Sequence, residues 1–219
     1  MTTDEKLINR MVLHADDNTD APGLLTGQMG VVIIVANYAK IKSEPRYDHV
    51  ADFLYDCAIN HVTTATGTGF ASGLAGICWG VEYLIQSGLM PGNGDEICED
   101  LDKRIMQYDI RRIDDFSLEE GLLGLWHYVW ARIQGNMKAG LPLPFDRRYL
   151  SDWESVLATN ADKFPDGALG RLRAAVNDGI LQESRLDFMP FIKPMESVPE
   201  TNLSLASGIA GYIAHKYLR

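Results

Sequence analysis

The sequence predicts an all-α fold, an α/α toroid or partial toroid of about five glycine-led helical hairpins, within a single domain spanning residues 1–219. A Gly-x-x-Gly frame recurs five times, with first glycines at Gly27, Gly73, Gly121, Gly167 and Gly208. The intervals are 46, 48, 46 and 41 residues (27 to 73, 73 to 121, 121 to 167 and 167 to 208), a spacing typical of helical-hairpin repeats. Strongly apolar segments also alternate with amphipathic ones, as inner and outer helices do in such an array.

Small residues at these spacings have a packing reason. Positions three and four apart share one helix face, so glycines there let a neighbouring backbone approach closely. Glycine inside a helix costs roughly 1 kcal/mol relative to alanine, so five copies require such a reason. Four copies also have a small residue four positions before the first glycine, whereas the fourth copy has Lys163 and is the weakest match; the four are Gly23, Gly69, Ser117 and Ser204.

Composition narrows the class of protein. The 219 residues are 46% hydrophobic and 23% charged, as expected of a folded soluble domain. The net charge of −10 argues against nucleic-acid and membrane-surface partners, which favour basic patches. Cys57, Cys78 and Cys98 lack metal-type spacing and are interpreted as reduced thiols of a cytoplasmic protein. The polar start at Thr2 does not resemble a secretion signal.

The first two helices follow from local patterns. Thr2 and Glu5 form a capping box for a helix at the N-terminus. The first glycine-led segment runs from Leu24 to Lys42. Its β-branched run Val31–Val35 alone would suit a strand, but the equivalent segments of the next two copies are too long and mixed in composition, so all are predicted to be helices.

The intervening segments are predicted to be amphipathic outer helices. Asn93 with Glu96 is interpreted as the cap of one, and Ser151 with Glu154 as the cap of another. Three prolines between 181 and 202 forbid a long helix there and predict an extended connection. Residues 203–219 are predicted to form the last inner helix.

The glycine-led segments resemble the lanthionine synthetase cyclase-like family. The resemblance rests on Gly-Leu-Leu-Thr-Gly-Gln-Met-Gly (23–30), Ser-Gly-Leu-Ala-Gly-Ile-Cys-Trp-Gly-Val-Glu-Tyr-Leu (72–84) and Ser-Gly-Ile-Ala-Gly (207–211). It implies an α/α toroid, which has seven glycine-led hairpins in that family. It also implies an enzyme whose zinc ion activates a cysteine of a precursor peptide for thioether ring closure.

The zinc ligands of that family are absent here. In the family they include a cysteine in a Trp-Cys-x-Gly pattern and a Cys-His pair directly before a Gly-x-x-Gly frame. The two residues before each frame here are Leu25-Thr26, Ala71-Ser72, Glu119-Glu120, Pro165-Asp166 and Ala206-Ser207. A Cys-Cys-His site cannot form from these residues, so no metal site and no cofactor are predicted, and enzymatic activity is left open.

Two candidate sites emerge from the repeat register. Glu119, Glu120 and Asp166 would lie at the rim formed by the inner helix starts, where paired carboxylates bind a cation or act as acid and base; the simpler interpretation is favourable charge near helix N-termini. Trp79, His127 and Arg173, each three residues after a second glycine, would face a central cavity and bind an anionic or peptide ligand, with His127 as a possible base. The simpler interpretation is a packed Trp, a core His and a solvated Arg.

Three functions therefore compete. The first is a cyclase-like protein without zinc chemistry that binds a peptide or a partner enzyme in a peptide-modification pathway. The second is an active enzyme with the acidic rim or an unrecognised metal site. The third is a structural interaction module completed by oligomerisation, since five frames in an open array would leave an apolar helix face for a homodimer or another protein to cover. The first is favoured.

Overall fold

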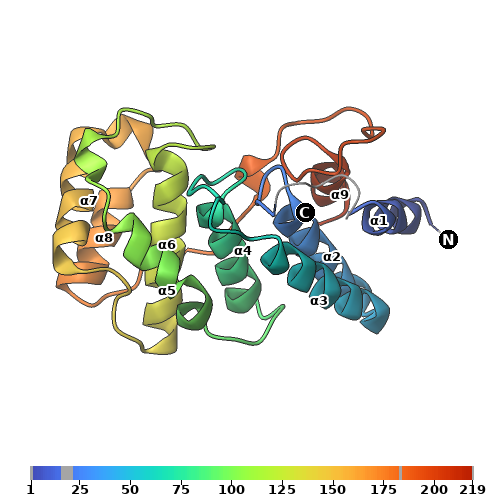
Figure 1. Cartoon of the computed structure of the whole chain (residues 1–219), viewed down its shortest axis with the longest axis horizontal. Helices are drawn as coiled ribbons and strands as arrows, with labels where there is room; N and C mark the ends of the chain where they lie inside the picture. The colour runs from blue at the N-terminus through green and yellow to red at the C-terminus, as the bar shows by residue number, and fades with distance from the viewer. Residues whose placement is uncertain (1, 16–21, 183, 219) are drawn as a thin grey trace.

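The computed structural model describes residues 2–15, 22–182 and 184–218, and the chain is all-helical over these ranges (Figure 1). No strand occurs in them, so the β-branched run Val31–Val35 is helical, as predicted. The α-helices of the described residues are α1 (Thr3–Leu13), α2 (Gln28–Lys42), α3 (Pro45–Asn60), α4 (Leu74–Gln86), α5 (Gly94–Ile105), α6 (Leu122–Ala139), α7 (Arg147–Thr159), α8 (Ala168–Asn177) and α9 (Ile209–Tyr217). None of these helices is both long and apolar enough to cross a bilayer.

Four helices form an inner row in the order α9, α2, α4 and α6, each in contact with the next. Helix α1 packs on α9, α3 on α2, and α5 on both α4 and α6, so these helices lie outside the row. The difference in burial follows the predicted pattern. In α2, 11 of 15 residues are buried, whereas α3 buries only one stripe, Tyr47, Ala51, Leu54 and Ala58.

Every glycine frame begins a helix. The first glycine of each frame is the N-cap of α2, α4, α6, α8 or α9. Four of these glycines have extended backbones, with φ between −99° and −122°. Gly167 differs, because its φ of 75° is left-handed. The copy that has Lys163 in place of a small residue is thus the one whose helix starts with a different geometry.

The second glycine of a frame makes room for a carbonyl group. At Gly30, Gly76, Gly124 and Gly211, an added Cβ would lie closer than 3.0 Å to the carbonyl oxygen of the residue six positions earlier. The loop before each helix therefore folds back over the first turn. At Gly170, an added Cβ would meet nothing within 4 Å, so the fourth frame again departs from the others.

A ladder of backbone hydrogen bonds joins neighbouring frames. The N–H of Ala206 donates to the carbonyl of Leu25 at 3.0 Å, the N–H of Leu25 to Ala71 at 2.9 Å, and the N–H of Ala71 to Glu119 at 2.9 Å. All four residues stand two positions before the first glycine of their frame. The last frame of the sequence therefore lies beside the first, and the order along the ladder is fifth, first, second and third.

Residues 184–202, which we call the crossing segment, run from α6 past α4 to α9 (Figure 1). Their only helical turn is a 3-10 turn at Met189–Phe191, as the prolines predicted. The side chain of Gln134 accepts hydrogen bonds from the N–H and the hydroxyl of Ser184. Phe188 then packs on Tyr83, with ring centroids 5.3 Å apart. The segment thus covers inner helices with aromatic side chains.

Two predicted helix starts have different outcomes. The capping box of Thr2 and Glu5 is confirmed at α1. The predicted cap at Ser151 is wrong, because α7 begins four residues earlier at Arg147, and Asp146 accepts a hydrogen bond from the N–H of Tyr149. Aspartate is among the strongest N-cap residues, so Asp146 and not Ser151 starts the helix.

Candidate functional site

A cleft of about 510 Å³ lies between α6, the loop before α8 and the crossing segment. We call it the aromatic cleft. Three tryptophans form its floor, and all are nearly fully buried. The residues that line it are Trp79, Leu123, Trp126, His127, Trp130, Asp162, Lys163, Phe164, Pro165, Arg171, Ser184, Arg185, Leu186, Asp187 and Pro190.

Two of the three residues that the sequence predicted for a binding site line this cleft together. Trp79 and His127 both contact Phe191 of the crossing segment, with ring centroids 5.3 Å and 5.0 Å apart. The inner face they share is therefore partly filled by an aromatic side chain. The cleft is the space that remains beside it.

Arg173 does not line the cleft, and Arg171 takes its place. The Nε of Arg173 pairs with a carboxylate oxygen of Glu154 at 3.3 Å, and the Arg173 side chain is 54% exposed. The repeat gives Arg173 the same position in its frame as Trp79 and His127 have on the other inner helices. Helix α8 starts from the left-handed Gly167, and Arg173 lies on its exposed side, so this analogy fails there. Lys163 was the feature of the sequence that could have revealed the difference.

Two contacts hold the guanidinium of Arg171. Its Nη1 donates to the carbonyl of Asp166 at 2.9 Å, and its guanidinium lies 5.8 Å from the ring centroid of Trp130. Its Nε is buried and has no hydrogen-bond partner. Among the described residues, no acidic side chain pairs with Arg171 or with the exposed Arg185. The remaining charges that line the cleft are the paired Asp162 and Lys163, and Asp187.

His127 is neutral in this environment. Burial, together with a smaller effect of the positive charge of Arg171, lowers the pKa of its imidazole from 6.5 to about 4. A neutral imidazole beside an unpaired guanidinium leaves the aromatic cleft open to an anion. It also means that His127 is not protonated at pH 7.

The depressed pKa of His127 predicts a loss of stability in acid. The unfolded chain binds a proton near pH 6.5 and the folded chain only near pH 4, so the contribution is intact above pH 6.5 and is lost as the pH falls toward 4. The loss amounts to about 3 kcal/mol in the free energy of unfolding. We expect urea titrations between pH 7 and pH 4 to show that the free energy of unfolding decreases less for His127→Phe than for the wild type. The exposed His49→Gln serves as the control, and equal slopes for all three proteins would contradict the assignment.

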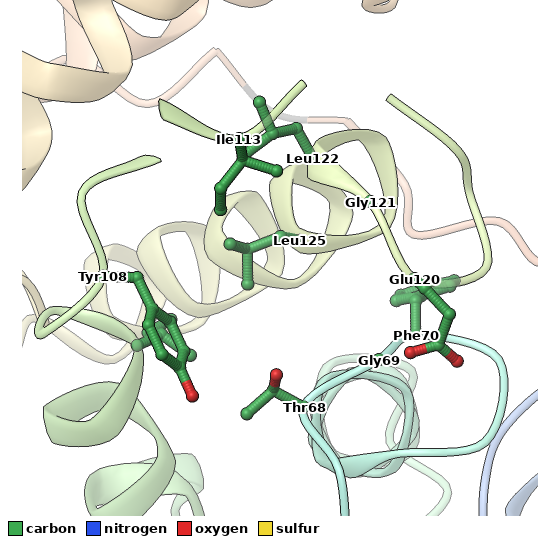
Figure 2. A pocket seen from close by; sticks show the side chains of 10 residues that line it. Thr68, Gly69, Phe70, Tyr108, Ile113, Glu120, Gly121, Leu122 and Leu125 are labelled. Atoms are coloured by element: carbon green, nitrogen blue, oxygen red, sulfur yellow. The ribbon is translucent and has the colours of Figure 1, made fainter. Parts of the chain in front are cut away.

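The structure separates the three acidic candidates. The carbonyl of Glu119 accepts the N–H groups of Phe70 and Ala71 in the ladder. Glu120 lines a second, smaller pocket (Figure 2). Asp166 lines neither that pocket nor the aromatic cleft. Neither of these two cavities therefore joins the three carboxylates, and an acid–base role for them stays a prediction.

The residues do not fit the zinc ion that the family resemblance implies. The described residues contain no group of three or more His, Cys, Asp or Glu side chains placed to hold a metal ion. Cys78 and Cys98 are buried, and the Sγ of Cys98 faces the carbonyl of Cys78. Cys57 is half-buried. No catalytic step through zinc is derived for this chain.

Glu82 belongs to a buried charge network. The sequence shows Glu82 on an otherwise apolar helix, where a buried carboxylate requires a partner. That partner is Arg132, whose Nη1 lies 2.7 Å from Glu82 Oε1 and whose Nη2 lies 2.8 Å from Asp102 Oδ2. Arg132, Glu82 and Asp102 are at most 3% exposed, and Tyr128 donates to Asp102. The network joins α4, α5 and α6 and has a structural role.

No protein-family model matches this chain, and neither does any curated protein or any solved structure. The five frames and the residues of the aromatic cleft are therefore the basis for a functional assignment.

Proposed function

We propose that this chain is a zinc-free relative of the lanthionine synthetase cyclase-like proteins, with a partial α/α toroid fold, and that it binds a peptide in the aromatic cleft. The family part of the proposal rests on the five glycine frames, each of which begins a helix. The ladder that places the fifth frame beside the first supports a toroid-like arrangement.

The ligand part of the proposal rests on one observation. Arg171 and Arg185 line the same cleft without an acidic partner among the described residues, above a floor of three tryptophans. A guanidinium pairs best with a carboxylate, and tryptophan faces accept apolar side chains. The expected ligand is an apolar peptide segment with a carboxylate, either at its C-terminus or on a side chain.

The unpaired charge of Arg171 adds an electrostatic argument. A carboxylate on the other guanidinium nitrogens would fix the side chain in one geometry and compensate its positive charge. The same carboxylate would raise the pKa of His127, because the charge of Arg171 contributes to its depression.

Peptide binding is measured through the fluorescence of the tryptophans in the cleft. The probes are an acetylated tripeptide of glycine, phenylalanine and leucine with a free carboxylate, and the same tripeptide as its C-terminal amide. We expect the carboxylate form to bind at least tenfold more tightly. We also expect Arg171→Gln to weaken its binding by tenfold or more, which corresponds to about 1.4 kcal/mol.

Arg173→Gln is the matched control, since it changes the same residue type two positions away on the exposed side of α8. It should bind like the wild type. Equal affinity for the acid and the amide, or an unchanged affinity of Arg171→Gln, would refute the cleft as a carboxylate site. The peptide-modification pathway, the homodimer and the cytoplasmic location stay predictions.

A further inference from the structure

A second cavity, of about 180 Å³, lies between the second and third glycine frames (Figure 2). We call it the frame pocket. It is formed by the loop before α4, the end of α5 with the residues that follow it, and the first turns of α6. Its lining residues are Thr68, Gly69, Phe70, Ile105, Tyr108, Ile113, Glu120, Gly121, Leu122 and Leu125.

Most of the side chains that line the frame pocket are apolar. Phe70, Ile105 and Leu122 are at most 1% exposed, and Leu125 stands in the middle of the view in Figure 2. An engineered apolar cavity of about 150 Å³ holds one benzene ring. The frame pocket therefore has room for one aromatic ring or one branched aliphatic group.

The pocket has one charged group, the carboxylate of Glu120. In Figure 2 this carboxylate lies on one side of the pocket, above Gly69, and the hydroxyl of Tyr108 lies on the other. The carboxylate lies directly against Gly69, in the space that an added Cβ would occupy. Glu120 accepts only a long hydrogen bond of 3.4 Å from Ser72 Oγ, and no basic side chain of the described residues pairs with it.

The neighbouring helix start does not make the pocket an anion site. The N–H of Gly121 donates to the carbonyl of Ser117, and the N–H of Leu122 to that of Asp115. The N–H of Gly124 also points to the carbonyl of Ser117, at 3.5 Å. These donors at the start of α6, which would otherwise attract an anion, are occupied by the loop. The available charge in the pocket is negative.

We propose that the frame pocket binds a primary ammonium group that bears one aromatic or aliphatic group. The ammonium would lie against the Glu120 carboxylate, with the hydroxyl of Thr68 as a further acceptor, and the apolar group would enter the cavity beside Leu125. Two sources have this chemistry, a small free amine and the amino terminus of a peptide. The site is separate from the aromatic cleft and does not depend on the function proposed for it.

Calorimetric titration with phenethylamine tests the proposal on the whole chain. We expect saturable binding with a Kd near 1 mM or tighter, as nine non-hydrogen atoms allow. N-acetylphenethylamine, which has the ring without the charge, should bind at least tenfold more weakly. Equal affinities of the two compounds, or absence of saturable binding both here and with the ammonium-bearing tripeptide described below, would overturn the proposal.

Two variants locate the site. Glu120→Gln should weaken phenethylamine binding by tenfold or more, whereas Glu119→Gln should leave it unchanged, because the backbone of Glu119, not its side chain, is used in the ladder. Both residues are exposed, and unchanged unfolding midpoints will show that both variants fold. Equal binding by the two variants would place the amine elsewhere and refute the assignment.

A further titration distinguishes a small free amine from the amino terminus of a peptide as the ligand. The amide of the tripeptide phenylalanine-glycine-glycine presents the same ring and ammonium on a peptide, and its N-acetylated form lacks the charge. Binding of either ammonium compound, lost in Glu120→Gln, supports the proposal. Preference for phenethylamine identifies a site for small amines, and preference for the tripeptide identifies a site for peptide amino termini.

Discussion

Gly124→Ala is expected to destabilise the protein by about 3 kcal/mol, whereas Gly170→Ala, at the same place in another frame, is expected to stabilise it. At Gly124 the new methyl group would lie closer than 3.0 Å to the carbonyl oxygen of Leu118 and to the Cβ of Phe70. The first atom belongs to the loop that folds over α6 and the second to the neighbouring frame. Neither moves without disturbing the ladder.

At Gly170 the same comparison predicts that alanine increases the stability of the protein. The added methyl group meets nothing within 4 Å, and the backbone of this residue is not left-handed. Alanine then contributes only its higher helix propensity, about 0.5–1 kcal/mol. Urea unfolding followed by tryptophan fluorescence measures both variants. If both substitutions change stability in the same direction, the carbonyl contact is not the reason for the second glycine.

Arg132→Met is expected to lower the free energy of unfolding by about 3–5 kcal/mol at pH 8. The substitution leaves the carboxylates of Glu82 and Asp102 buried without their cation. Burial already raises the pKa of each of these two carboxyl groups, although Arg132 opposes the shift. Without Arg132 both pKa values rise further, so the folded variant takes up protons more readily than the unfolded chain.

The pH dependence of this variant follows from that difference. A carboxyl group whose pKa is raised by folding stabilises the protein below its unfolded pKa, and this contribution is lost as the pH rises through the folded pKa. The deficit of Arg132→Met relative to the wild type should therefore be smaller at pH 5 than at pH 8. The variant that combines it with Glu82→Gln and Asp102→Asn should recover much of the loss.

Arg111→Met provides the control for the Arg132 experiment. Arg111 forms ion pairs with Asp109 and Asp152 at the surface, where its side chain is 47% exposed. Its loss should leave the unfolding midpoint nearly unchanged, because exposed pairs contribute little. If Arg132→Met lowers the free energy of unfolding equally at pH 5 and pH 8, lost packing is responsible and not the unpaired carboxylates.

The helix starts were predictable from the sequence because their cause is local. A glycine frame specifies a helix whose first turn lies against its own loop, and all five frames do begin a helix. Helix α7 begins at Arg147 and not near Ser151, although its N-cap Asp146 is also a local signal. The partner of Glu82 could not be predicted from local patterns, since Arg132 is 50 positions away in sequence.

The candidate site was less predictable because its geometry depends on contacts distant in sequence. The prolines of the crossing segment excluded a long helix, but nothing local indicated that Phe191 would pack against Trp79 and His127. Arg171 replaced Arg173 in the cleft because the left-handed Gly167 starts α8 with a different geometry. The pairing of an apolar cavity with Glu120 likewise required two loops 48 residues apart to meet.

The hydrogen bond between Ala206 and Leu25 has a consequence for biosynthesis. In a linear repeat protein, each unit completes its contacts with the unit made just before or after it. Here the first frame emerges from the ribosome without the neighbour on one of its sides, and that neighbour is synthesised about 180 residues later. At roughly 5–20 residues per second, one side of α2 stays uncovered for tens of seconds. During that interval the exposed apolar face of the nascent chain is where a chaperone would bind.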